Sequence, residues 1–208
     1  MLIKICGITR QEDADLAVAL GASALGFVFW PASPRFVDPY RAKRIVASLP
    51  IGIAAVGVFV DQPIGYVNGV AALARLTGVQ LHGGESIDFA RGVTRPVLKA
   101  VALSSGGEPA GVDAWPARVT LLADVHDPAR RGGTGRTVDW AVAAGLARRR
   151  RLVLAGGLTP DNVGEAVRVV RPFGVDVSSG VEARPGVKDP QKLRAFLSVV
   201  RGMEEVHE

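Results

Sequence analysis

The side chains with the clearest chemical potential are a lysine and a thiol near the start of the chain. Lys4 and Cys6, the only cysteine, occupy alternate positions of the segment Leu2–Cys6. In an extended strand, residues two apart point to the same face, so Lys4 and Cys6 share the face opposite Ile3 and Ile5. A neighbouring cation lowers the pKa of a thiol from ~8.5 towards a range where its thiolate can act as a base. Cys6 is therefore a candidate base.

Polar residues also lie at or near the ends of three later strand-like segments. Strand alternation places them on the face opposite the more apolar one. They are Gln80, His82, Asp124, Asp176 and Ser178. If the apolar faces pack against helices, all of these side chains point to the other side of the sheet, together with Lys4 and Cys6. Polar groups that converge where branched apolar side chains are normally found predict a functional site.

The elements that must position these residues alternate regularly along the 208 residues. Short apolar runs predict strands at 2–6, 24–29, 54–60, 78–82, 97–101, 119–124, 151–155 and 174–178. Helical spacing predicts helices at 11–20, 39–48, 64–76, 86–92, 138–147, 161–170 and 189–201. Eight such units predict a single-domain (βα)8 TIM barrel over 1–208, close to the minimal size for that fold. The segment 103–117 is rich in Gly, Ser and Pro, so its helix should be short or broken. A doubly wound open sheet is the structural alternative.

A closed barrel makes a specific prediction for Lys4. The first and eighth strands would be neighbours, and a buried lysine requires a partner of opposite charge. We expect Lys4 to pair with Asp176, either as a purely structural ion pair or as one that also favours the Cys6 thiolate.

Glycine-containing loops supply candidate anion sites. Gly156 and Gly157 follow the seventh expected strand, and Ser178, Ser179 and Gly180 follow the eighth. The loops after these two strands are the usual phosphate site of (βα)8 barrels, because their backbone N–H groups are exposed. A third loop, with Gly132 and Gly133, is either a mobile lid or a plain surface loop. Arg35, after the second strand, could bind a carboxylate through two hydrogen bonds, although a loop arginine is more often solvated.

Composition limits the other classes of partner. The formal net charge of +5 is compatible with nucleic acid or with small anions. The basic run Arg148–Arg151 follows a predicted helix, where cations are favourable, and no aromatic residues interleave with it to stack on bases. We therefore expect no nucleic-acid partner. We also expect no membrane span, signal peptide, disulfide or metal site, and a cytoplasmic location.

Several stretches, in order along the chain, resemble the phosphoribosylanthranilate isomerase family. They are Lys4-Ile5-Cys6-Gly7-Ile8-Thr9, Gly26-Phe27-Val28-Phe29 with Ser33-Pro34-Arg35, Val56-Gly57-Val58-Phe59, Val79-Gln80-Leu81-His82-Gly83, Gly132-Gly133-Thr134-Gly135 with Asp139-Trp140, Ala155-Gly156-Gly157-Leu158, and Val175-Asp176-Val177-Ser178-Ser179-Gly180-Val181-Glu182. The resemblance implies a (βα)8 barrel of tryptophan biosynthesis that needs neither cofactor nor metal. The implied reaction is an Amadori rearrangement, from aldose to ketose, of N-(5-phosphoribosyl)anthranilate to 1-(2-carboxyphenylamino)-1-deoxyribulose 5-phosphate.

The resemblance also implies roles for individual residues. Cys6 matches the general base and Asp124 the general acid, while Arg35 matches the residue that holds the anthranilate carboxylate. The loops at Gly156-Gly157 and Ser178-Ser179-Gly180 would hold the phosphate. Gln80, His82, Gly132 and Gly133 are expected around the substrate, with Lys4 and Asp176 in support; His82 is equally compatible with a purely structural role.

Several alternatives stay open at this stage. Asp127 lies close enough to Asp124 to compete for the acid role. A related sugar-phosphate barrel isomerase, acting on an aminoaldose of the histidine pathway, would use the same phosphate loops but is expected to carry a carboxylate in place of Cys6. A nucleic-acid-binding module would need a contiguous basic face. The sequence does not determine the oligomeric state, and a homodimer is one option.

Overall fold

The computed structural model describes residues 1–103, 107–125 and 138–205, and it contains a closed barrel of eight parallel strands. The strands are β1 (Leu2–Cys6), β2 (Ala24–Val28), β3 (Ala54–Phe59), β4 (Gly78–Leu81), β5 (Val97–Leu103), β6 (Thr120–Val125), β7 (Leu152–Leu154) and β8 (Gly174–Val177). They follow one another around the ring in chain order, and β1 closes it by pairing with β8. The predicted TIM barrel is confirmed, and the open-sheet alternative is wrong.

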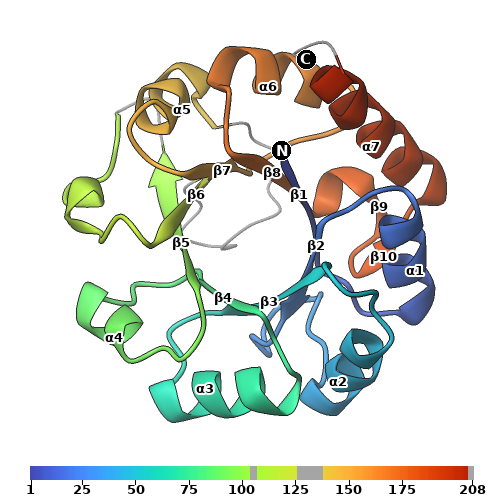
Figure 1. Ribbon diagram of the computed structural model, residues 1–208, viewed down its shortest axis with the longest axis vertical. Coiled ribbons are helices and arrows are strands. Elements are labelled where there is room, and N and C mark those ends of the chain that lie inside the picture. The colour runs from blue at the N-terminus through green and yellow to red at the C-terminus, as the bar shows by residue number, and fades with distance from the viewer. Residues whose placement is uncertain (104–106, 126–137, 206–208) are drawn as a thin grey trace.

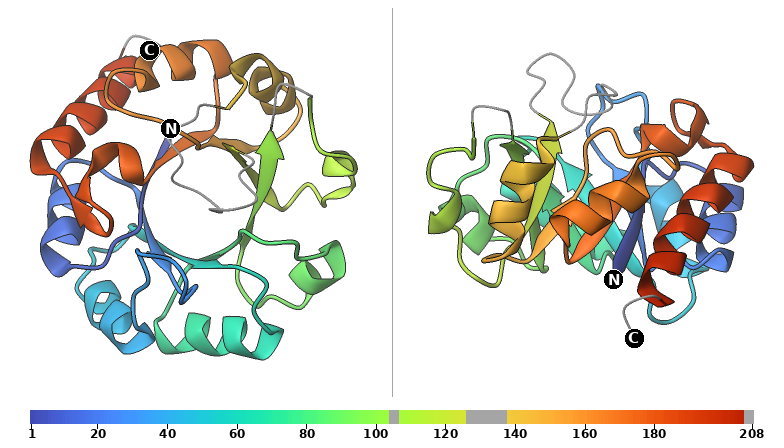
Figure 2. Two further views of the ribbon diagram at one scale, coloured as in Figure 1. Left: turned by 180° about the vertical axis from the view of Figure 1, so that it is seen from behind. Right: turned by 90° about the horizontal axis from the view of Figure 1, so that it is seen from above.

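Helices form one layer around the outside of the ring (Figures 1 and 2). They are α1 (Gln11–Ala19), α2 (Pro39–Ala47), α3 (Ile64–Leu73), α4 (Ile87–Arg91), α5 (Trp140–Ala147), α6 (Val163–Val170) and α7 (Pro190–Glu205). Between β5 and β6 the described residues contain only the short 3-10 helix η1 (Val112–Ala114). The expectation of a short or broken helix in this segment is confirmed.

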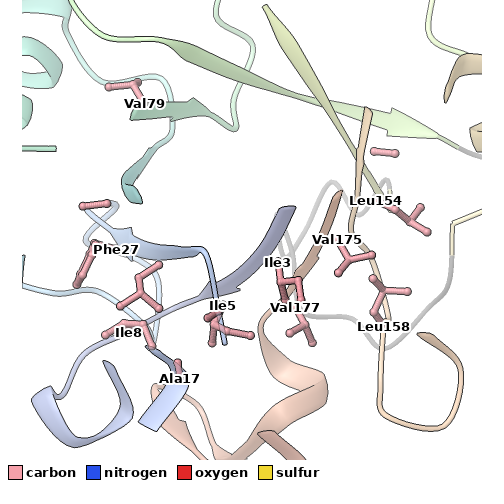
Figure 3. Packing of buried hydrophobic residues seen from close by; sticks show 14 of the residues in the cluster. Ile3, Ile5, Ile8, Ala17, Phe27, Val79, Leu154, Leu158, Val175 and Val177 are labelled. Atoms are coloured by element: carbon pink, nitrogen blue, oxygen red, sulfur yellow. The ribbon is translucent and has the colours of Figure 1, made fainter. Parts of the chain in front are cut away.

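The main hydrophobic core lies between the strands and the helices. Ile3 and Ile5 of β1, together with Val175 and Val177 of β8, belong to this core, where Figure 3 shows them close to one another. The alternate residues face the interior of the ring, where Leu122 and Val153 form a small separate cluster. The residues that the sequence pattern places on the apolar face therefore point outward to the helices, and the alternate residues point into the barrel.

The boundaries differ from the predicted ones in small ways. Each predicted strand is present, with ends shifted by one or two residues at most. The sequence did not predict the short 3-10 helix η2 (Ser179–Val181) or the hairpin of β9 (Glu182–Arg184) and β10 (Val187–Lys188). These elements are too short to show a periodic pattern.

Candidate active site

A cavity of about 440 Å³ opens where the barrel strands end and the loops to the next helices begin. Its lining brings together these predicted residues: Cys6, Arg35, Gln80, His82, Asp124, Gly156, Gly157, Asp176, Ser178, Ser179 and Gly180. Lys4 is fully buried next to them. Gly132, Gly133 and the alternative acid Asp127 lie outside the described residues.

The predicted ion pair between Lys4 and Asp176 is present. The two residues are register partners on β1 and β8, and Lys4 Nζ donates to Asp176 Oδ2 at 2.8 Å. Burial opposes the charge on Lys4, but the Asp176 carboxylate and the nearby Cys6 outweigh it and raise the pKa of Lys4 above its ordinary value. The lysine therefore stays a cation beneath the cavity.

Cys6 lies in an environment that differs from the expected one. Burial raises the pKa of the Cys6 thiol and the Asp176 carboxylate raises it further, whereas the cations Lys4 and Lys188 lower it and offset the rise only in part. The expected effect of Lys4 on the thiol pKa is present, but the larger effect of burial, which sequence reasoning missed, makes the net shift upward. A thiolate with a raised pKa is a stronger base but forms in a smaller fraction of molecules.

Gly26 makes the space in which Lys4 and Cys6 lie, and sequence reasoning missed this role. A Cβ at Gly26 would lie 2.7 Å from Cys6 Sγ and 3.1 Å from Lys4 Nζ. Gly26 pairs with Cys6 across β1 and β2, so any side chain there would point at the thiol. Glycine is therefore needed here because a side chain would collide with the site residues, and not because the backbone makes a turn.

Asp124 contacts a histidine that is itself held by an amide. His82 Nε2 lies 3.2 Å from Asp124 Oδ2, and Gln80 Nε2 lies 2.8 Å from His82 Nδ1. Gln80 is buried, whereas the side chains of His82 and Asp124 are each 15% exposed towards the cavity mouth. The three polar residues predicted from β4 and β6 thus form one connected group.

Arg35 is held by a carboxylate of the same chain. Its Nε and Nη2 donate to the two oxygens of Glu182 at 2.9 and 2.7 Å, and Lys188 Nζ donates to Glu182 Oε1 at 3.1 Å. Burial opposes the charge of Glu182, but the contacts with Arg35 and Lys188 outweigh it and lower the pKa of the carboxyl. A ligand carboxylate would therefore meet the remaining N–H groups of a guanidinium whose orientation is already set.

The two predicted phosphate loops lie against each other. Gly156 and Gly157 adopt φ values of +76° and +70°, which L side chains rarely adopt. A Cβ at Gly180 would lie within 2 Å of the carbonyl oxygen of Leu158, so a glycine is needed for this close approach. The buried Ser178 Oγ has no hydrogen-bond partner among the described residues, so a ligand oxygen could satisfy it.

An apolar wall completes the cavity. Val28, Trp30 and Val58 pack near Cys6 and line the cavity together with Arg35. Sequence reasoning did not select them, although strand alternation places Val28 and Val58 on the inner face. The wall offers a surface for an aromatic ring beside a guanidinium.

Outside the cavity, the basic run is engaged in contacts within the chain. Arg149 forms ion pairs with Glu108 and Asp113, Arg150 donates to backbone carbonyls, and the Arg151 guanidinium stacks 4.0 Å from the Phe173 ring centroid. Among the described residues, no cluster of three or more His, Cys, Asp or Glu could hold a metal ion. None of the described helices is both long enough and apolar enough to cross a bilayer.

Comparison with known proteins identifies the family. Residues 3–199 match the family model for N-(5'-phosphoribosyl)anthranilate isomerase. The chain belongs to this family. The isomerase of that name from Pelobacter propionicus is 49% identical over 199 residues, which cover 96% of this chain and 95% of the relative. The family predicted from the sequence motifs is therefore confirmed.

Two solved structures of the family have the same fold. One, of monomers of the dimeric enzyme from Thermotoga maritima, is 41% identical, with a TM-score of 0.87 and coverage of 97% of this chain and 100% of that one. The other is a family member in complex with reduced 1-(o-carboxyphenylamino)-1-deoxyribulose 5-phosphate. It is 40% identical, with a TM-score of 0.85 and the same coverage.

Proposed function

We propose that Cys6 and Asp124 perform the acid–base chemistry of this chain, an aldose–ketose isomerase of tryptophan biosynthesis. Its reaction converts N-(5'-phosphoribosyl)anthranilate to 1-(2-carboxyphenylamino)-1-deoxyribulose 5-phosphate. The observation that supports these roles best is that both residues line one cavity from different walls: β6 lies three strands from β1 around the ring, beyond β8 and β7. A sugar in the cavity would lie between them.

The steps follow from the two groups. Asp124 donates a proton to the ribose ring oxygen, the C1'–O bond breaks, and the nitrogen lone pair forms an iminium. Cys6, as a thiolate, removes the proton from C2', and the electrons of that C–H bond form an enolamine, which tautomerises to the ketose. One proton is given and one is taken, so the substrate and product are isomers.

The anchors for the two anionic ends of the substrate lie on either side of Cys6. Arg35, after β2, would bind the anthranilate carboxylate, with the ring against Trp30. The loops at Gly156, Gly157 and Ser178 to Gly180, after β7 and β8, would bind the phosphate. Because β1 lies between β2 and β8, this placement brings the middle of the substrate, the ribose, to Cys6. Gln80 and His82 line the cavity opposite these anchors, and Gly132 and Gly133 remain expected substrate contacts.

The assembly and the location are further parts of the proposal. The relative from Thermotoga maritima is described as dimeric, which supports a homodimer for this chain. A biosynthetic enzyme of this family is expected in the cytoplasm. Light scattering across a concentration series would test the dimer, and a mass that stays at the monomer value would contradict it.

Turnover of the purified protein tests the activity itself. With freshly prepared N-(5'-phosphoribosyl)anthranilate, we expect the anthranilate fluorescence to decay in proportion to enzyme concentration. The aminoaldose of the histidine pathway is the matched control substrate, and we expect it to react much more slowly. Faster turnover of the control substrate would overturn the assignment in favour of the related isomerase.

A further inference from the structure

Gln80, His82 and Asp124 form a chain of contacts that ends on the proposed proton donor. The first contact is 2.8 Å, from Gln80 Nε2 to His82 Nδ1, and the second is 3.2 Å, from His82 Nε2 to Asp124 Oδ2. Each nitrogen of the imidazole therefore faces one neighbour. A ring fixed at both nitrogens cannot rotate without losing a contact.

The barrel wall is built to permit this approach. Asp124 lies on β6 and Gln80 on β4, and β5 separates the two strands. On its inner face β5 carries Ala100 and Ala102, and Ala102 is the register partner of Asp124. Because these side chains end at Cβ, the imidazole can reach across β5 to the carboxyl group.

The orientation of the Gln80 amide determines which ring nitrogen carries the proton. With the amide nitrogen of Gln80 facing Nδ1, as in this structure, that nitrogen donates and Nδ1 accepts, so the neutral ring carries its proton on Nε2. The Nε2–H group then points at Asp124 Oδ2. A donor in this place stabilises the carboxylate that remains after Asp124 has given its proton to the sugar.

We propose that His82 and Gln80 are positioning residues for Asp124: Gln80 fixes the tautomer of His82, and His82 holds the carboxyl group and stabilises its anion. This inference rests on the proposed role of Asp124 as proton donor. It differs from the expectation that Gln80 and His82 bind the substrate directly. The two roles differ in what they change: positioning affects the proton-transfer rate, whereas substrate contact affects KM.

Steady-state kinetics of three variants separate the two roles. In His82→Phe and Gln80→Met we expect kcat to fall about tenfold or more, a part of the ~10²–10⁴ that general acid–base catalysis contributes, with little change in KM. In His82→Gln, the amide can place an N–H donor near the position of Nε2, so much of kcat should be recovered. Gln11→Met, on the surface of α1, is the matched control for Gln80→Met and should leave both constants unchanged.

A double-variant cycle distinguishes failure of this inference from failure of the proposed function. If His82 acts through Asp124, adding His82→Phe to Asp124→Asn should cause no further loss of kcat/KM. A full additional loss, a rise in KM with kcat unchanged, or no effect of the single His82 and Gln80 variants would overturn the positioning role. Full activity of Asp124→Asn alone would instead overturn the proposed acid. Thermal unfolding of each variant shows whether the fold is retained.

Discussion

Lys4 and Asp176 lie opposite each other on β1 and β8, with Lys4 Nζ 2.8 Å from Asp176 Oδ2 in the interior of the barrel. A buried ion pair of this kind rarely adds stability relative to apolar side chains, because both charges lose their hydration. Its two members act on the neighbouring Cys6 in opposite directions: Lys4 lowers the pKa of the thiol against the larger effect of burial, and Asp176 raises it. The charges of this buried pair therefore influence how readily the proposed base ionises.

Replacement of the lysine should make the base harder to ionise. In Lys4→Met the thiol keeps its burial and loses a nearby cation, so the pKa of Cys6 should rise further. Because the base is the thiolate, kcat/KM increases as the pH rises through this pKa, and that increase should shift to higher pH in the variant. Titration of the thiol by its alkylation rate would measure the pKa directly. An unchanged Cys6 pKa would make the ion pair purely structural.

The same replacement should also reduce stability. Lys4→Met leaves Asp176 buried without its cation, and loss of one partner of a buried pair costs about 3–5 kcal/mol of unfolding free energy. The double variant Lys4→Met with Asp176→Leu removes both charges and should recover a large part of this loss in denaturant titrations. If the double variant were no more stable than the single one, the cost would come from packing and not from the unpaired charge.

The space provided by Gly26 gives a third prediction. In Gly26→Ala the new methyl group would meet Cys6 Sγ at 2.7 Å, so the thiol or the strand must move and kcat/KM should fall. A displacement of about 1 Å at a reacting group can cost about 10²-fold. Gly69→Ala in α3 is the matched control, because its Cβ meets nothing within 4 Å; activity should be unchanged and the helix slightly more stable. Equal kcat/KM for the two variants would contradict this role of Gly26.

Glu182 should contribute to stability in a pH-dependent way. Arg35 and Lys188 hold the pKa of this carboxyl below its ordinary value of 4.5 in the folded chain, against the opposing effect of burial. Because the pKa is lower in the folded chain than in the unfolded one, the carboxylate adds to the free energy of unfolding above the ordinary pKa. This stabilisation is lost as the pH falls below the ordinary pKa towards the lower folded value. Glu182→Gln should therefore be less stable at neutral pH and lose less of its stability on acidification than the native chain.

The glutamine variant also tests the orientation of Arg35. Without the carboxylate, the guanidinium loses its two charge-assisted hydrogen bonds, so KM should rise more than kcat falls. Glu12→Gln, at an exposed position of α1, is the control for both measurements and should behave like the native chain. Parallel acid unfolding curves for native, Glu182→Gln and Glu12→Gln proteins would contradict the role of Glu182.

The fold could be predicted from the sequence because it depends on patterns that repeat. Strand alternation places Lys4, Gln80 and Asp176 on the inner face, and the pairing of Lys4 with Asp176 follows from the closure of the ring. The contacts that could not be predicted are set by the closed fold. Arg35 meets Glu182, which lies 147 residues away in the sequence and begins the unpredicted β9–β10 hairpin.

The direction of the shift in the pKa of Cys6 also could not be predicted from the sequence. The sequence identifies the nearby cation, because Lys4 is two residues away on the same strand. It does not identify the degree of burial, which depends on the packing of Val28, Trp30 and Val58 around the thiol and which decides the sign of the shift. The roles of the small residues Gly26 and Ala102 could not be predicted for a related reason: they lie in the space that these residues leave for other side chains.

Turnover of N-(5'-phosphoribosyl)anthranilate by the native protein, compared with that by Cys6→Ala and Asp124→Asn, tests the two proposed proton-transfer groups together. We expect a loss of about 10²-fold or more in kcat for each variant, with native-like thermal unfolding, because each removes one of two proton-transfer groups. Substantial activity in folded Cys6→Ala would contradict the thiolate base. Activity that survives Asp124→Asn but is lost in Asp127→Asn would keep the reaction and assign the acid to Asp127.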